Sequence, residues 1–222
     1  MRAIILSGGK GVRLRPLTFD CPKPLVHLRG RPIIDYIVEH LTSHGVSNIT
    51  LAAGYKQEML TQHFSNSSVS VVDTGDEDIA RRISQLDDGS VDPILVLYGD
   101  TLSNVSISAL LQSHHSSQRP ATVTVWPLKS HFGLFTLDQH SRVETYSEKP
   151  VLNYWINIGY FVLSRQALDI VRDSPTFELA LSTLVSTKAL NAFRHHGLHI
   201  TVNSRADLED AEAALENWNS VA

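Results

Sequence analysis

Cysteine is nearly absent from this sequence: Cys21 is the only one in 222 residues. A single cysteine excludes an internal disulfide framework and a cysteine-rich zinc site, and it fits a chain that works in the reducing cytoplasm. No apolar run approaches the roughly 20 residues that a membrane-spanning helix needs, and the short apolar start of the chain lacks the pattern of a signal peptide. We therefore expect a cytoplasmic protein with no membrane partner.

A strong excess of charge of one sign is also missing. The formal net charge is -4 and the cationic residues are dispersed, so the basic stripe that a nucleic-acid-binding domain needs is not there. Internal repeats, low-complexity linkers and heptad patterns are absent as well. With 42% hydrophobic residues the chain is able to bury one large core. We predict a single domain over residues 1–222 with no nucleic acid partner, and homo-oligomer formation stays open.

Apolar segments in the first half of the chain alternate between strand and helix patterns. Strands are expected at 2–7, 49–55, 68–73 and 93–100, and helices at 32–45 and 57–64. Such an alternation predicts a parallel sheet covered by helices.

The second half is richer in strand patterns. Strands are expected at 121–128, 132–137, 142–148 and 156–164, followed by helices at 177–186 and 205–215. Together the two halves predict an α/β fold, a Rossmann-like mixed, mainly parallel sheet flanked by helices, whose strand ends face one cleft.

The first strand leads into a glycine-rich loop, SGGKGVRLRPLT, followed by PKP. The spacing fits neither the dinucleotide fingerprint, because Leu14 stands where a third glycine belongs, nor the Walker loop, because Val12 follows Gly11. Glycines let backbone amides surround an anion, and Arg13 and Lys23 supply cations close by. The loop therefore predicts a site for a polyphosphate.

The stretch from Gly8 to Pro24 resembles the signature GGxGxRLxPLTxxxPKP of the sugar-1-phosphate nucleotidyltransferase family. The segment VVDTGD at 71–76 resembles its glucose-1-phosphate cytidylyltransferases. The resemblance covers nearly the whole chain and extends to LVLYGDTL, YSEKP and INIGYFVL. It implies transfer of a nucleotidyl group from a nucleoside triphosphate, with CTP favoured, to a sugar 1-phosphate, giving a nucleotide sugar and pyrophosphate.

The same resemblance implies the residues of the site. Arg13 and Lys23 are the expected catalytic cations. The nucleotide is expected to contact Leu6, Gly8, Gly9, Gly11, Tyr55, Thr74 and Gly99. The sugar and its phosphate are expected to contact Gly133, Glu148, Lys149, Asn157 and Gly159.

Two residues are candidate ligands of Mg²⁺. Asp100 ends an apolar strand and follows Gly99, so its carboxylate is expected at the carboxyl edge of a parallel sheet, where it suits a hard cation. Asn203 occupies the position at which many relatives carry a second aspartate. Each has an alternative role as a cap: Asp100 in a turn, and Asn203 or Ser204 at the start of the last helix, where Asp207 completes a capping box after Ser204.

Departures from the family pattern leave the base and the sugar open. Cys21 replaces a second lysine, and His131 replaces an arginine before Phe-Gly. Transfer to a non-sugar phosphate or phosphonate such as phosphocholine remains an alternative, as does a non-catalytic module that binds a nucleotide sugar. The adjacent histidine pairs at 114–115 and 195–196 lack the spacing of a zinc site and are expected to face solvent.

Overall fold

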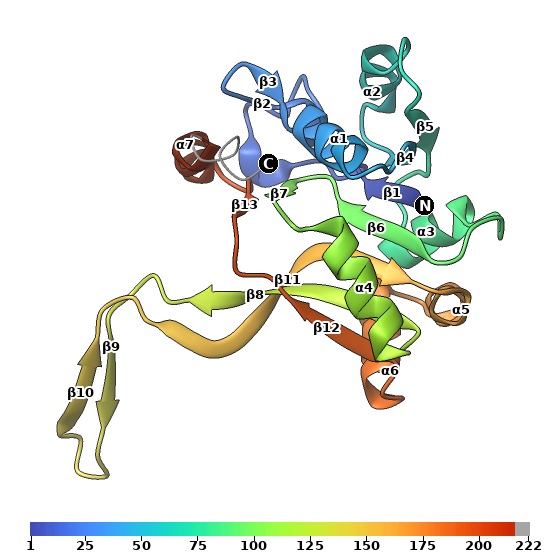
Figure 1. Ribbon diagram of the computed structural model, residues 1–222. Coiled ribbons are helices and arrows are strands. Elements are labelled where there is room, and N and C mark those ends of the chain that lie inside the picture. The colour runs from blue at the N-terminus through green and yellow to red at the C-terminus, as the bar shows by residue number, and fades with distance from the viewer. Residues whose placement is uncertain (216–222) are drawn as a thin grey trace.

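The computed structural model describes residues 1–215, and residues 216–222 of the predicted domain lie outside the described residues. The chain alternates strands and helices through most of this length (Figure 1). The strands are β1 (Arg2–Leu6), β2 (His27–Leu28), β3 (Arg31–Pro32), β4 (Asn48–Ala53), β5 (Ser70–Asp73), β6 (Ile94–Tyr98), β7 (Thr101–Ser103), β8 (Ala121–Lys129), β9 (Leu134–Leu137), β10 (Val143–Ser147), β11 (Val151–Leu163), β12 (Leu190–Arg194) and β13 (His199–Thr201). The helices are η1 (Val12–Leu14), η2 (Lys23–Leu25), α1 (Ile33–Ser43), α2 (Gln57–His63), α3 (Ile79–Leu86), α4 (Ile107–Ser117), α5 (Arg165–Asp173), α6 (Phe177–Ser186) and α7 (Arg205–Ala214).

A seven-stranded sheet with the order β12-β8-β11-β6-β1-β4-β5 forms the centre of the molecule. Strand β1 lies parallel to both β4 and β6, and β5 lies parallel to β4. Strand β11 is antiparallel to its neighbours β6 and β8, whereas β12 is again parallel to β8. The expected mixed, mainly parallel sheet is confirmed.

Helices cover both faces of this sheet. In β1, Ala3 and Ile5 pack into a core shared with α1, α2, α4 and α7, while Ile4 packs into a second core with α3, α5 and α6. Successive strand residues point to opposite faces, so a strand that is buried on both sides needs an unbroken apolar run. The run AIIL in β1 and the run ILVL in β6 meet that need, and nearly all of these side chains are inaccessible to solvent.

Helices α3, α4 and α5 were not among the expected elements. Helix α4 carries a recognisable start signal, because Ser106 caps it by accepting a hydrogen bond from the Ala109 amide, and Ile107 and Leu110 then bury one face. In α5, the side chains of Ala167, Leu168 and Val171 likewise bury one face of the helix. Helices α3 and α5 supply much of the second core and α4 packs into the first, so their apolar residues were present in the sequence at helical spacing.

Strands β9 and β10 pair only with each other. They form a hairpin, here called the arm (residues 130–150), that projects from the rest of the molecule, the body (Figure 1). Every residue of both strands is exposed. These segments were correctly expected to be strands, but they lie outside the central sheet.

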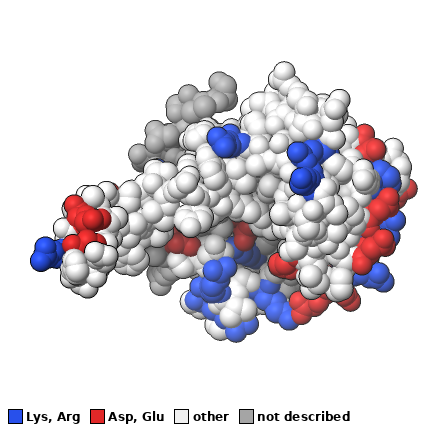
Figure 2. Space-filling view, turned by 90° about the horizontal axis from the view of Figure 1, so that it is seen from below, with Lys and Arg blue, Asp and Glu red and all other residues white. Residues whose placement is uncertain are grey.

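The charge distribution on the surface and the length of the helices concern the expectations about nucleic acid and membrane partners. On the face shown in Figure 2, side chains of both signs are interspersed between large uncharged areas. Within residues 1–215, none of the helices has both the length and the apolar character needed to cross a bilayer.

Candidate functional site

The glycine-rich loop begins where β1 ends and folds back over the carboxyl edge of the sheet. Gly11 has a φ of 58°, in the left-handed region that glycine adopts without strain. Its carbonyl accepts hydrogen bonds from the Leu14 amide at 2.9 Å and from Thr18 Oγ1 at 2.8 Å. The short helices η1 and η2 that follow place Arg13 and Lys23 beside the loop.

Four residues form what we call the charged cluster: Arg13 and Lys23 of the loop, and Asp100 and Asn203 from two distant parts of the chain. The Lys23 ammonium donates to Asp100 Oδ2 at 2.5 Å and to Asn203 Oδ1 at 2.9 Å. Arg13 Nη2 donates to the same Asn203 oxygen at 2.9 Å. Lys23 is buried, so its attraction to Asp100 is screened little by water.

The fold explains why these residues meet. Strand β6 ends at Tyr98 and β7 begins at Thr101, which leaves Asp100 in the turn at the carboxyl edge of the sheet. Strand β13 pairs with β7, and Val202 then donates its amide to the Asp100 carbonyl at 3.4 Å. Asn203 follows directly, so the short β7–β13 sheet brings the C-terminal segment to Asp100.

Ser204, and not Asn203, caps the last helix. The Ser204 side chain accepts from the Asp207 amide, and the Asp207 carboxylate accepts in return from the Ser204 amide, which together form a capping box. The Asn203 backbone amide also donates to Asp207 Oδ2 at 2.9 Å. The Asn203 side chain is therefore left to face Arg13 and Lys23.

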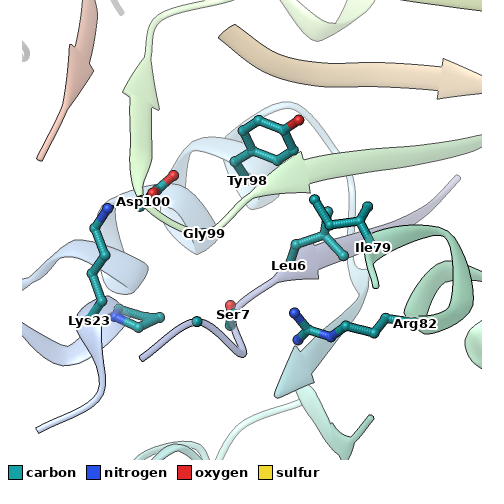
Figure 3. A pocket seen from close by; sticks show the side chains of 10 residues that line it. Leu6, Ser7, Lys23, Ile79, Arg82, Tyr98, Gly99 and Asp100 are labelled. Carbon is teal, nitrogen blue, oxygen red and sulfur yellow. Dashed lines mark hydrogen bonds and ion pairs between the residues drawn. The ribbon is translucent and has the colours of Figure 1, made fainter. Parts of the chain in front are cut away.

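Two cavities open beside the charged cluster. The smaller, of about 240 Å³, is lined by Gly9, Gly11, Val12, Arg13, Leu14, Lys23, Asp100 and Asn203. The larger, of about 380 Å³, is lined by Leu6, Ser7, Gly9, Lys23, Pro24, Ile79, Arg82, Tyr98, Gly99 and Asp100 (Figure 3). Gly9, Lys23 and Asp100 line both, so the charged cluster stands where the two cavities adjoin.

Tyr55 and Thr74 lie behind the loop and support it. The Tyr55 hydroxyl hydrogen-bonds to the carbonyls of Thr18 and Phe19 at 3.1 Å each, and the Tyr55 amide donates to the Gly8 carbonyl. Thr74 is buried, and its hydroxyl donates to the Ala53 carbonyl at 2.8 Å. Both side chains are thus engaged in holding the backbone around the cavity.

Asn157 and Gly159 contact Tyr98, whose side chain lines the larger cavity. Asn157 Nδ2 donates to the Tyr98 hydroxyl at 3.3 Å, and its Oδ1 accepts from the Gly159 amide at 2.8 Å. Gly159 has a φ of 76°, and a Cβ there would lie 2.4 Å from the Tyr98 ring. Burial raises the pKa of the Tyr98 hydroxyl, which therefore acts as a neutral group in the wall of the cavity.

Gly133, Glu148 and Lys149 lie on the arm instead. Glu148 Oε2 accepts a hydrogen bond from the Tyr146 hydroxyl, and the Cα of Gly133 packs against both of these side chains. Among residues 1–215, no hydrogen bond or ion pair joins these three residues to the charged cluster. The two cavities thus bring Leu6, Gly9, Gly11 and Gly99 of the expected nucleotide contacts together with the charged cluster. The expected sugar-phosphate contacts are divided, because Asn157 and Gly159 lie beside Tyr98 while the other three lie on the arm.

The histidine pairs were only partly assigned correctly. His114 and His195 are buried, so the expectation that both pairs face solvent is wrong for the first member of each. His114 Nδ1 lies 3.0 Å from Thr122 Oγ1, a partner on a neighbouring strand that local sequence does not indicate. No group of three His, Cys, Asp or Glu side chains within the described residues has the arrangement of a metal site.

Sequence reasoning also missed Ser7, Ile79, Arg82 and Tyr98 as cavity residues. Arg82 carried a weak signal, since it stands beside Ile83 at a buried position of the amphipathic helix α3. A charged residue at such a position needs polar partners, which often belong to a site.

Comparisons with known proteins agree with this geometry. Residues 2–201 match the family model described as nucleotidyl transferase. The chain is 30% identical to a probable glucose-1-phosphate cytidylyltransferase of Bacillus subtilis, over 99% of this chain and 96% of that protein. It is 33% identical to a probable mannose-1-phosphate guanylyltransferase of Oryza sativa, over 79% of this chain and 53% of that protein.

A solved structure shows the same fold. The crystal structure described as a putative glucose-1-phosphate thymidylyltransferase from Bacillus anthracis superposes with a TM-score of 0.76 at 19% identity, covering 96% of this chain and 94% of that one.

Proposed function

The chain belongs to the nucleotidyl transferase family, and from that membership we propose that it transfers a nucleotidyl group from a nucleoside triphosphate, with CTP favoured, to a sugar 1-phosphate. The observation that carries this proposal is the charged cluster: two cations of the glycine-rich loop meet the side-chain oxygens of Asp100 and Asn203, from three segments of the chain. Residues 1–222 are proposed to form one catalytic domain.

The proposed reaction is an in-line displacement at the α-phosphorus. An oxygen of the sugar 1-phosphate forms a bond to this phosphorus, the bond from the α-phosphorus to the bridging oxygen breaks, and pyrophosphate leaves with the electron pair. Because the attacking oxygen is already anionic, the protein needs no general base. Its task is to hold two phosphates that repel each other and to stabilise the charge that develops.

Each cation has a proposed share in this task. Lys23 lies at the junction of the two cavities and is assigned to the α-phosphate. Arg13 lines only the smaller cavity and is assigned to the leaving β- and γ-phosphates, to which a guanidinium donates paired hydrogen bonds. Backbone amides between Gly8 and Gly11 are proposed to complete the triphosphate site, with Leu6 and Gly99 at the nucleoside end.

The side chains of Asp100 and Asn203 suit Mg²⁺. Both offer oxygen atoms, the donors that a hard cation prefers, and both oxygens already lie within 3 Å of one cation, the Lys23 ammonium. We propose that these two residues hold the metal, whose chemistry is to neutralise charge on the phosphate oxygens. The neutral Asn203 gives this pair one negative charge fewer than two aspartates would.

The acceptor end is proposed to include Asn157 and Gly159, which contact Tyr98 in the wall of the larger cavity. Gly133, Glu148 and Lys149 are proposed to contact the sugar and its phosphate. Because they lie on the arm, this contact requires the arm to approach a cavity, either of the same chain or of a second copy.

The preference for CTP rests on the VVDTGD segment and on the similarity to the cytidylyltransferase of Bacillus subtilis. A panel of nucleoside triphosphates and sugar 1-phosphates, assayed for Mg²⁺-dependent pyrophosphate release, tests both the class and the substrates. We expect turnover with one sugar 1-phosphate and CTP. Turnover with phosphocholine alone would select the alternative acceptor, and nucleotide binding without any turnover would select the non-catalytic module.

A further inference from the structure

The short sheet of β7 and β13 holds the two proposed Mg²⁺ ligands at one end. Thr201 of β13 lies opposite Thr101 of β7, and one step further Val202 donates its amide to the Asp100 carbonyl. Asn203 is the next residue along the chain, and Asp100 directly precedes β7. The distance between the side chains of Asp100 and Asn203 therefore depends on the register in which β13 pairs with β7.

Burial of apolar side chains fixes this register only in part. Ile200 and Val202 alternate along β13, and both are buried in the first core. A slip of one residue would turn them to the opposite face of the strand, so the core excludes it. A slip of two residues would preserve the alternation, because Leu198 is also apolar, and it would move Asn203 by about 7 Å along β7. Another contact is needed to exclude that slip.

Two side chains continue the pairing of β7 and β13 beyond its last backbone pair, His199 with Ser103. Leu198 stands next in this register, opposite Asn104. The Leu198 amide donates to Asn104 Oδ1 at 2.7 Å, and the Leu198 carbonyl accepts from Ser103 Oγ at 2.6 Å. The half-buried side chain of Asn104 thus takes the place that a backbone carbonyl has in a regular antiparallel ladder.

Gly197 makes the contact with Asn104 specific to one register. A Cβ at Gly197 would lie 2.4 Å from Asn104 Oδ1. The Trp126 indole donates to the Gly197 carbonyl at 3.0 Å, which also ties this residue to β8. A slip of two residues would put His195 or His199 in the place of Gly197, and the Cβ of either would strike Asn104. The pair of Asn104 and Gly197 therefore excludes the slip that the core permits.

We propose that Asn104 is a positioning residue for the reaction: by accepting the Leu198 amide it fixes the register of β13, and so places Asn203 beside Asp100 and Lys23. Asn104 lines neither of the two cavities, so it acts through Asn203. This inference rests on the proposed function, because it takes Asn203 as a ligand of Mg²⁺. Removing a group that orients a metal ligand typically costs about 10- to 100-fold in metal affinity or activity.

The first test measures the place of Asn203 without requiring turnover. The side-chain amide of Asn203 gives a pair of proton–nitrogen NMR signals, which are identified by their loss in Asn203→Asp. We expect these signals to shift in Asn104→Ala. They should keep their wild-type positions in Asn104→Asp, because aspartate retains an oxygen that accepts the Leu198 amide. Unshifted signals in Asn104→Ala would overturn the proposal.

Asn191→Ala is the matched control. Asn191 is another half-buried asparagine with a side-chain hydrogen bond, which it donates to Ser113 Oγ at 3.2 Å. Its replacement removes a comparable contact at a place that does not touch β13. The Asn203 signals should therefore stay where they are, and a shift as large as that in Asn104→Ala would contradict a specific role of Asn104.

Kinetics test the consequence for Mg²⁺. In Asn104→Ala, the Mg²⁺ concentration for half-maximal pyrophosphate release should rise about 10-fold, while the KM for the sugar 1-phosphate stays constant. Asn104→Asp should restore the wild-type value. A lower kcat at unchanged Mg²⁺ dependence would give Asn104 a structural role only and would overturn the proposal. If the wild type releases no pyrophosphate, the proposed function fails, and the NMR signals alone decide whether Asn104 places Asn203.

Gly197→Ala is the second variant, which keeps the proposal testable if Asn104→Ala does not fold. The new Cβ should displace the Asn104 oxygen from the Leu198 amide. We therefore expect the Asn203 signals to shift and the Mg²⁺ requirement to rise, as in Asn104→Ala. Asn203 signals at their wild-type positions in Gly197→Ala would contradict the proposal.

Discussion

The body and the arm contain strands of similar length with opposite surroundings. The strands β1 and β6 are almost wholly buried, whereas β9 and β10 are exposed at every residue. The candidate site divides in the same way, with the charged cluster in the body and Glu148 and Lys149 on the arm. Parallel pairing of strands that are distant in sequence fixes their carboxyl ends at one edge, while a hairpin positions only its own neighbours.

The largest expected effect comes from Lys23 in the body. Lys23→Ala should lower kcat by about 10²- to 10³-fold, because the ammonium acts where charge develops in the transition state. Pyrophosphate-release kinetics measure this loss, with Lys129→Ala as a control at an exposed lysine of β8. Wild-type turnover in Lys23→Ala would remove this residue from the reaction.

Two glycines compare the body and the arm directly in stability. Gly159→Ala should lower the free energy of unfolding by about 2–4 kcal/mol, because alanine is strained at a φ of 76° and its Cβ would strike the Tyr98 ring, which packs against the second core. Gly133→Ala on the arm should cost less than about 1 kcal/mol, because the atoms in its way belong to the ends of the exposed side chains of Tyr146 and Glu148. Urea unfolding of both variants gives the comparison, and equal losses would show that the arm is packed as firmly as the body.

The sequence predicts the parts of the site that depend on local patterns better than the parts that depend on how distant segments pack. The loop from Gly8 to Pro24 is contiguous, so its residues are assigned by their spacing along the chain alone. Asp100 could be placed because a strand pattern ends at it. Asn203 could not be separated from a helix cap, since the choice depends on the side chain of Asp207.

The rest depends on contacts between distant segments. Arg82 enters the cavity only because α3 packs behind β1 and β4, and no local sequence pattern predicts the direction of its side chain. Glu148 and Lys149 were expected near Asn157 because the family resemblance assigns all three to the sugar and its phosphate. The length of β11 and the separate pairing of the arm strands keep them apart.

A third prediction concerns pH and the buried His40 of the body. Burial, followed by the nearby His44, lowers the pKa of His40 from 6.5 to about 4. The unfolded chain therefore binds a proton more readily, and the stability contributed by neutral His40 is present above pH 6.5 and is lost as the pH falls toward 4. This loss should be on the order of 2 kcal/mol.

Unfolding experiments at pH 7 and pH 5 measure this loss in the free energy of unfolding. The variant His40→Gln should be less stable at pH 7 but should lose less stability between the two values. His140→Gln, at an exposed turn of the arm, is the control and should change neither. Identical pH dependence in the wild type and His40→Gln would show that another group is responsible.

A smaller effect is expected at Asn203. Asn203→Ala should reduce kcat/KM by about tenfold, with partial recovery at high Mg²⁺, whereas Asn203→Asp should keep its activity because it retains an oxygen ligand. Thermal stability should change little in either variant, because Ser204 provides the cap. Ser204→Ala supplies the contrast, with an expected loss of about 1 kcal/mol in stability. Normal Mg²⁺ dependence in Asn203→Ala would leave Asp100 as the only proposed protein ligand.

The smallest effect on stability is expected on the arm itself. Lys149→Ala should alter the free energy of unfolding by less than about 0.5 kcal/mol, because Lys149 is exposed. Its kinetic effect should be selective: the KM for the sugar 1-phosphate rises severalfold and the KM for the nucleotide stays constant. Unchanged values for both substrates would exclude Lys149 from the acceptor site.

Mixing two variants then distinguishes the two ways in which the arm could reach a cavity. If Lys149 acts in a second copy of the chain, a mixture of Lys23→Ala and Lys149→Ala contains cavities with an intact Lys23 served by arms with an intact Lys149. The mixture should then be more active at low sugar 1-phosphate than the two variants measured separately and averaged. If Lys149 serves its own chain, no such cavity forms, and the activity of the mixture equals the average.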